Sequence, residues 1–437
     1  MAEPRRLCSE NRHASATAGP RPMLGVPAKR LGAGLITGAA DDDPSGIATY
    51  SQAGAQFGYS MLWTMPLTLP LMVAIQLVSA RIGYVTRCGL TANIKQHFSP
   101  TVLWLVVGML VIANTLNVAA DIAAMAQALH LVIGGPTGVY AIAFGVLSLT
   151  LQVFMRYRVY VRWLKWLTLA LLAYVALVFT VQLDWPALAR QIFMPGLAFD
   201  RDTLMMIVAV CGTTISPYLF FWQAALEVEG GGAGQPRSGR DVQRQLRRIQ
   251  TDTIVGMTFS NVIGFCIILS AAATLHRAGI NDIRTSAQAA EALRPLAGDT
   301  CFLLFSLGII GNGLLAVPVL AGSAAYAVAE AAGWPASQDA RLEMGEGRAF
   351  YAVLAAATLG GVLLCFTPID PVKGLFWSAV LNGVIALPIM AVMMRMASRR
   401  EAMGAHVVGP RLRFVGWLAT GFMAGVVAAM LASLAAP

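Results

Sequence analysis

Three consecutive aspartates followed by a proline stand in an apolar stretch, TGAADDDPSGIATYSQAG, at residues 37–54. A carboxylate inside a bilayer is costly unless it is paired, so an aspartate here predicts a function. Successive helical residues differ in direction by about 100°, so the three carboxylates cannot all face one cavity. We expect Asp43, beside the proline, to be a cation ligand. We expect Asp41 and Asp42 to face water on the cytoplasmic approach to it.

Prolines interrupt two apolar stretches in matching places. Pro44 lacks an amide N–H and clashes with the preceding turn, and Gly46 follows it, so we expect the first helix to unwind here. Pro217 lies in the same way within CGTTISPYLFFWQAALEVE, residues 211–229. A pair of interrupted segments in corresponding positions predicts a transporter site at mid-membrane.

The groups available at the two interruptions are oxygen atoms. Backbone carbonyls freed by each break can bind cations. Asp43 adds a carboxylate, and Thr213 and Ser216 precede the second proline with hydroxyl groups. Neither interrupted segment contains a histidine. An all-oxygen ligand set suits hard cations such as Mg²⁺, Ca²⁺ or Mn²⁺.

The composition places these residues in a membrane protein. The chain has 437 residues, of which 57% are hydrophobic and 12% are charged, whereas a soluble domain has about 25% charged residues. We therefore predict an all-α polytopic membrane protein in the lipid bilayer. The net charge of +9 is ascribed to basic loops that set topology, not to a nucleic-acid partner. Residues 1–30 are polar and basic, and we expect a flexible cytoplasmic tail there.

Eleven candidate transmembrane helices follow the tail. We predict them at 31–57, 61–82, 101–131, 137–156, 160–183, 202–229, 251–275, 300–330, 349–369, 372–396 and 412–434. Arginine and lysine are concentrated in alternate loops, which predicts a cytoplasmic N-terminus and an external C-terminus. Each interruption opens a set of five helices. We thus expect two repeats, 31–183 and 202–396, which are inverted because five is odd, and an eleventh helix at 412–434.

Other polar residues lie deep in the predicted helices. Asp121 is the second intramembrane acid, either a proton relay or a carboxyl group hydrogen-bonded between helices. Asn382 lies in the tenth helix. Glu227, at the end of the sixth helix, either guards an aqueous path or is simply solvated.

The stretch DPSGIATYSQAGAQFGYSMLW resembles the first helix of the NRAMP family of divalent-metal transporters, whose motif reads DPGN. LGIIGNGLLAVPVLAG and VLNGVIALP resemble the eighth and tenth helices of that family. The resemblance implies the inverted-repeat fold of the amino acid–polyamine–cation superfamily, also called the LeuT fold. It implies metal ligation by Asp43 and by the carbonyl of Thr213.

The departures from the family pattern concern the site. Gly46 stands where the family has asparagine, and Ser216 where it has methionine. Tyr218 and Gln223 replace two histidines, and Asp121 is nearest to the second of two acids used for protons. TTISPYLFFWQA is similar to the NRAMP-related magnesium transporter branch.

From these features we predict a transporter, not an enzyme, that works by alternating access. We expect it to carry partly hydrated Mg²⁺ and also Mn²⁺, with weak or no proton coupling, because Mg²⁺ keeps several waters. Fe²⁺ is a possible substrate. We expect no cofactor and no obligate protein partner, and a plasma-membrane location, in bacteria the inner membrane.

Three alternatives remain open. The first is a proton-coupled Mn²⁺/Fe²⁺ importer, which the missing soft ligand opposes. The second is a carrier of an organic cation or an amino acid, although Asp43 would repel a substrate carboxylate. The third is a prenyl-transfer enzyme, but such enzymes need two separated DDxxD clusters and the chain has one DDD run.

Overall fold

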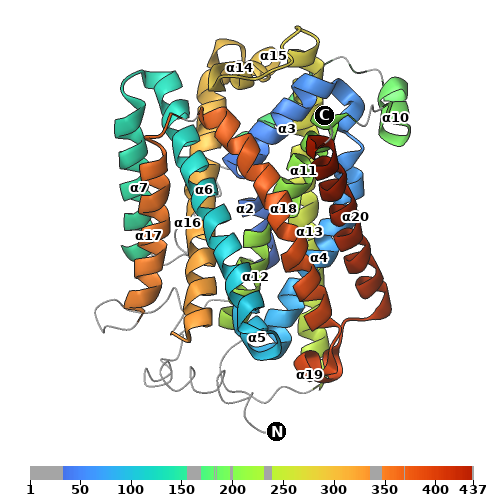
Figure 1. The fold of residues 1–437 in the computed structure, drawn as a ribbon. Coiled ribbons are helices and arrows are strands. Elements are labelled where there is room, and N and C mark those ends of the chain that lie inside the picture. The colour runs from blue at the N-terminus through green and yellow to red at the C-terminus, as the bar shows by residue number, and fades with distance from the viewer. Residues whose placement is uncertain are drawn as a thin grey trace.

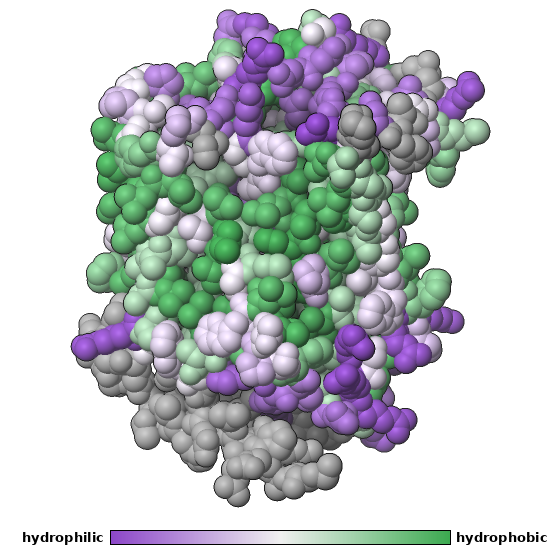
Figure 2. All heavy atoms as spheres, viewed as in Figure 1, coloured by the Kyte–Doolittle hydropathy of each residue, from purple (hydrophilic) through white to green (hydrophobic). Residues whose placement is uncertain are grey.

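The computed structural model describes residues 33–154, 169–181, 183, 185–196, 200–230, 239–334, 347–368 and 370–435, and in this part every regular element is a helix. The helices form an elongated bundle (Figure 1). Hydrophobic residues cover the middle of the bundle, and hydrophilic residues gather at its two ends (Figure 2). Among the described residues, eight helices are long and apolar enough to cross a membrane. The expected tail at 1–30 lies outside the described residues.

Most of the expected spans are continuous helices with bounds close to those predicted, except that α13 begins 12 residues before the predicted span 251–275. They are α4 (Thr64–Thr86), α6 (Pro100–Ile133), α7 (Thr137–Phe154), α13 (Gly239–Ala271), α16 (Cys301–Ala332), α17 (Arg348–Leu364), α18 (Pro371–Ala397) and α20 (Pro410–Ala435). The fifth expected span, 160–183, lies partly outside the described residues. Its described part contains the 3₁₀ turn η2 (Leu169–Leu171) and α9 (Leu172–Val178).

Both proline-containing spans are broken where the sequence predicts. The first consists of α2 (Ala33–Asp41) and α3 (Pro44–Phe57), and the second of α11 (Arg201–Thr214) and α12 (Pro217–Gly230). Pro44 is the first residue of α3 and Pro217 the first of α12, where the missing N–H has no helical partner to lose. Each proline therefore restarts a helix instead of kinking one.

Short elements that the sequence analysis did not predict cap the two ends of the bundle. Figure 1 shows α10, α14 and α15 at the upper end and α5 and α19 at the lower end. They are α5 (Leu90–His97), α10 (Trp185–Phe193), α14 (Ser286–Glu291), α15 (Arg294–Ala297), α19 (Arg400–Met403), η1 (Gly58–Met61), η3 (Ala272–His276), η4 (Gly298–Thr300) and η6 (Gly404–His406). Hydropathy does not reveal most of them because they are short; η3 lies at the end of the predicted span 251–275.

The broken helices occupy the centre because glycines let neighbouring backbones touch them. A Cβ on Gly38 of α2 would lie 2.3 Å from the carbonyl oxygen of Gly256 in α13. A Cβ on Gly212 of α11 would lie 2.0 Å from the carbonyl oxygen of Ala379 in α18. Small residues allow such close helix packing in membrane proteins. The two breaks are thereby held among α6, α13, α16 and α18.

Candidate functional site

Asp43 caps the N-terminus of α3 at the first break. Its backbone is extended, with φ −69° and ψ 168°, and its Oδ1 accepts a hydrogen bond of 2.7 Å from the Gly46 N–H. The side chain is buried. The partial positive charge of a helix N-terminus stabilises a carboxylate at this position. Among the described residues, no basic side chain forms an ion pair with this carboxyl group.

Tyr218 joins the second break to the first. Its hydroxyl lies 3.3 Å from Oδ2 of Asp43 and 3.3 Å from the carbonyl oxygen of Ala40, near the end of α2. Tyr218 is the second residue of α12 and is buried. The hydroxyl can donate to one of these two oxygens at a time. The two interruptions thus face each other, as a site shared between them requires.

The end of α11 supplies the other expected ligands. The Ser216 hydroxyl lies 2.7 Å from the carbonyl oxygen of Thr213 and 3.0 Å from that of Gly212, and donates to them. The Oγ1 of Thr213 lies close to Gly46, because a Cβ on that glycine would be 3.0 Å from it. Asp43, Gly46 and Thr213 are therefore brought together. Ser216 adjoins them, but its hydrogen points back at the α11 carbonyls.

The prediction that Asp41 and Asp42 face water is wrong for this structure. Their side chains are only 1% and 3% exposed. The Ser260 hydroxyl of α13 lies 2.6 Å from an oxygen of Asp41 and 3.0 Å from an oxygen of Asp42. The Asn312 amide of α16 donates to the Asp42 carbonyl at 2.8 Å. Packing of α13 and α16 against the break covers both carboxylates.

Asp121 lies on α6 beside the same break. Its side chain is fully buried, and neither oxygen has a hydrogen bond of normal geometry with a described residue. It lies close to Asp43 and to the backbone N–H of Ser45 in the first turn of α3. Elsewhere on α6, the Asn117 amide donates to Asn382 of α18 at 3.0 Å. Asp121 thus faces the break, whereas Asn382 ties α18 to α6.

The remaining expected residues lie further along α12. Gln223 accepts a short hydrogen bond from Gln76 of α4 and donates to Thr253 of α13 at 2.9 Å. Glu227 is nearly buried and interacts electrostatically with Asp252 and Arg248. With a rise of about 1.5 Å per residue, both lie well below Asp43. The structure does not bring them to the break.

Several residues of the site were missed by the sequence analysis. Tyr50 of α3 is buried, and its ring lies 3.5 Å from the position of a Cβ on Gly46. Ser260 and Asn312 come from helices α13 and α16, far away in the sequence. In helices that are apolar on all sides, a single serine, tyrosine or asparagine gives no signal of which neighbour it faces.

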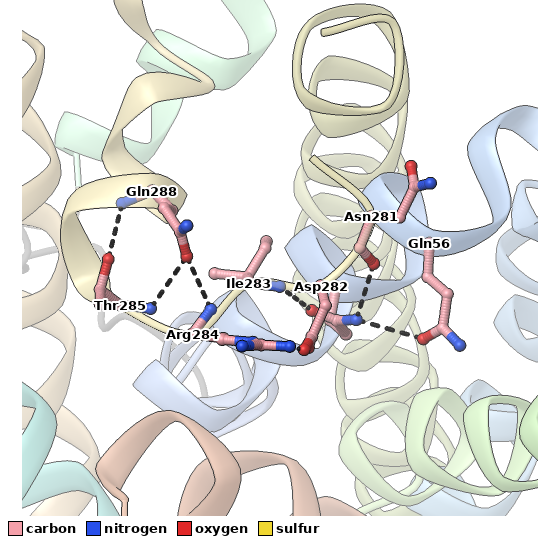
Figure 3. A network of polar contacts seen from close by, with 8 residues as sticks. Gln56, Asn281, Asp282, Ile283, Arg284, Thr285 and Gln288 are labelled. Carbon is pink, nitrogen blue, oxygen red and sulfur yellow. Dashed lines mark hydrogen bonds and ion pairs between the residues drawn. The ribbon is translucent and has the colours of Figure 1, made fainter. Parts of the chain in front are cut away.

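The end of α3 nearest to α14 is covered in this structure. Gln52 of α3 donates to the carbonyl oxygen of Asn281 at 3.3 Å and accepts from the Ile283 N–H at 2.9 Å. Figure 3 shows this network, in which the segment before α14 lies along α3. Beneath it is a cavity of about 20 Å³, lined among others by Ala48 and Leu375, which is room for about one water.

The arrangement fits the binding of an oxygen-seeking cation. Among the described residues, no three histidine, cysteine or acidic side chains form a metal-binding group. The donors at the break are one carboxylate, hydroxyl groups and the carbonyls at the helix ends. Such a set offers few direct ligands and leaves positions for water.

Comparison with known proteins identifies the family. The sequence profile described as "Natural resistance-associated macrophage protein-like", Nramp, matches residues 34–433. The chain belongs to the Nramp family. It is 29% identical over 308 residues to the divalent metal cation transporter MntH of Yersinia pestis, covering 67% of this chain and 71% of that protein. It is 28% identical to MntH of Erwinia tasmaniensis, covering 65% and 68%.

Solved structures show the fold of this Nramp chain. A manganese transporter mutant of Eremococcus coleocola superposes with a TM-score of 0.74 at 15% identity, covering 93% of this chain and 88% of that one. The nucleobase-cation symporter Mhp1 gives a TM-score of 0.57 at 14% identity, covering 92% of each chain. The fold is therefore the inverted-repeat LeuT fold.

Proposed function

We propose that this Nramp chain carries divalent metal ions across a membrane by alternating access, with the ion bound between the breaks at Asp43 and Thr213. The observation that supports this most is the buried Asp43 carboxylate at the junction of two helix ends, without a basic partner. Its curated relatives named MntH are divalent metal cation transporters. We further propose a plasma-membrane location, in bacteria the inner membrane, and the charge bias of the loops supports a cytoplasmic N-terminus.

The ligand set favours hard ions, Mg²⁺ first and Mn²⁺ next. Gly46 has no side chain to offer where the family motif has asparagine, and Ser216 brings a hydroxyl in place of a thioether. Mg²⁺ is bound with several waters retained, so a site with few direct ligands suits it. These two residues support our proposal that the chain is nearest to the NRAMP-related magnesium transporter branch.

Weak or absent proton coupling follows from the residues on α12. The two positions where the family has histidines are Tyr218 and Gln223, which stay neutral at physiological pH. Both are engaged in hydrogen bonds that link helices. Asp121 is the one acid of α6 that faces the break, and its role as a proton carrier is part of the test below.

Ion uptake by purified protein in liposomes tests the proposal. We expect Mg²⁺ and Mn²⁺ to enter without acidifying the interior, as followed by metal-sensitive and pH-sensitive dyes. The Asp43→Asn variant should abolish uptake. Asp370→Asn is a matched control, since Asp370 also precedes a proline and caps a helix, α18, by accepting from Val372 at 2.9 Å. Cd²⁺ or Fe²⁺ transport with proton influx, and none of Mg²⁺, would refute the proposal.

One contact favours the rival function, a proton-coupled Mn²⁺/Fe²⁺ importer. The sulfur of Met125 on α6 and the ring of Pro44 both lie beside Gly313, at 2.4 and 3.4 Å from the position of a Cβ there. A thioether near the break would favour softer metals. Met125→Leu keeps the volume and removes the sulfur. If the rival is right, this change lowers Fe²⁺ and Cd²⁺ uptake; if Mg²⁺ is the substrate, uptake of Mg²⁺ is unchanged.

A further inference from the structure

The first turns of α13 carry exposed arginines beyond the apolar part of that helix. Arg240, Arg244 and Arg247 are exposed, and none forms an ion pair with another described residue. α13 has 33 residues, so it is about 50 Å long at 1.5 Å per residue. The hydrocarbon core of a bilayer is about 30 Å thick. The helix therefore continues beyond the hydrocarbon at its arginine end.

The opposite side of these turns is fixed by packing. Ile249 is buried with Leu77 and Ala80 of α4, and Val242 and Leu246 pack against them. Leu412, near the start of α20, packs against the same cluster. Leu412 lies between Arg411 and Arg413, which are both exposed.

Because α13 and α20 both pack against this cluster on α4, their exposed arginines lie at the same end of the bundle, and we call these five residues the basic surface. They are Arg240, Arg244, Arg247, Arg411 and Arg413. Figure 2 shows strongly hydrophilic residues gathered at this lower end, around α19.

Exposed apolar side chains continue the same helix faces. Val255 lies eleven residues after Arg244, or about three turns, so both point the same way about 16 Å apart; Val255 is 50% exposed. On α20, Leu418 lies seven residues after Arg411, about two turns, and is 52% exposed. On α13 and on α20, one helix face therefore carries exposed apolar side chains along the membrane and arginines at its end.

We propose that the basic surface binds the phosphate headgroup of an anionic lipid whose acyl chains lie along the exposed faces of α13 and α20. Arginine pairs with phosphate through two parallel hydrogen bonds. The arginines of the basic surface lie at the edge of the hydrocarbon, where lipid phosphates also lie. Clusters of basic residues next to a membrane helix attract anionic lipids. A lipid bound to α13 would influence the first break, because α13 packs backbone to backbone against α2 at Gly38.

Native mass spectrometry of the detergent-solubilised full chain tests the proposal. The protein is titrated with phosphatidylglycerol, with phosphatidylcholine and with inorganic phosphate. We expect phosphatidylglycerol to bind at least tenfold more tightly than the other two. The double variant R244Q/R411Q should bind it about 25-fold more weakly, since each arginine near an anionic headgroup contributes about fivefold.

Two further variants separate a specific site from general charge. R190Q/R201Q removes the same charge from exposed arginines outside the basic surface, and we expect binding within twofold of the wild type. R244K/R411K keeps the charge, and we expect most of the affinity to return. Equal losses in R244Q/R411Q and R190Q/R201Q would overturn the proposal. So would inorganic phosphate binding as tightly as the lipid, which indicates a soluble anion as the ligand. Circular dichroism confirms that each variant is folded.

Discussion

The hydroxyl of Tyr218 lies 3.3 Å from Oδ2 of Asp43, so the start of α12 touches the residue that caps α3. The other carboxylate oxygen of Asp43 accepts from the Gly46 N–H. The carboxylate is thus held between the two broken helices. At the proposed metal site, a cation would meet both oxygens already fixed in direction, with lone pairs still available.

Tyr218→Phe removes the hydroxyl and keeps the ring. We expect the protein to lose about 1 kcal/mol of stability, the usual net value of a hydrogen bond. We expect divalent ions to bind severalfold more tightly, because a proton donor no longer competes for Oδ2. Thermal unfolding and metal-competition calorimetry measure the two effects. Loss of binding as complete as in Asp43→Asn would show instead that the hydroxyl is needed to build the site.

Asp43→Asn separates charge from helix capping. Asparagine caps a helix N-terminus about as well as aspartate does, so we expect the fold to remain. Loss of a buried charge should weaken Mg²⁺ and Mn²⁺ binding by at least about 100-fold, or roughly 3 kcal/mol. Calorimetry on the purified variant measures the affinity. An affinity within threefold of the wild type would remove Asp43 from the site.

Gly46→Asn restores the side chain that the family motif has at this position. The Cβ would lie 3.0 Å from the Thr213 hydroxyl, so the tight contact must relax by a few tenths of an ångström. We expect the amide oxygen to replace a water and to raise the ratio of Mn²⁺ to Mg²⁺ uptake. Gly46→Asn with Thr213→Ala relieves the crowding and should show the same preference. An unchanged uptake ratio in both variants would contradict a role for this position in selectivity.

Gln52→Ala should loosen the contact between α3 and the segment before α14. The change removes one hydrogen bond to Asn281 and one from Ile283 (Figure 3). At about 1 kcal/mol each, the open state should gain about tenfold or more in population. Alkylation of an Ala48→Cys residue in a cysteine-free background reports on opening, since Ala48 lines the cavity beneath. Gln56→Ala is the control, because Gln56 bonds to Gln52 and not to the segment before α14.

Gly212→Ala tests the close contact between α11 and α18. Its Cβ would overlap the Ala379 carbonyl at 2.0 Å, and overpacking of this kind costs about 1–3 kcal/mol. We expect a lower unfolding temperature and lower ion uptake. Gly108→Ala in α6, where a Cβ meets no atom within 4 Å, should be neutral or slightly stabilising. Equal stability of both variants would show that α11 and α18 separate readily.

The sequence alone determined the class of protein and the positions of the breaks. Apolar runs predict membrane helices because every backbone polar group must be bonded inside the bilayer. Pro44 and Pro217 predict interruptions because proline cannot donate a backbone hydrogen bond. The choice of Asp43 also followed from local chemistry, since it is the aspartate next to the break.

Only the tertiary structure decided what surrounds those aspartates. Asp41 and Asp42 are buried because Ser260 of α13 covers them, and Tyr218 and Asp121 meet the first break from α12 and α6. These contacts join residues that are between 78 and 219 positions apart in the sequence. The sequence of a helix that is apolar on every side does not reveal which of its faces contacts which neighbouring helix. Close packing at glycines such as Gly38 and Gly212 determines these contacts.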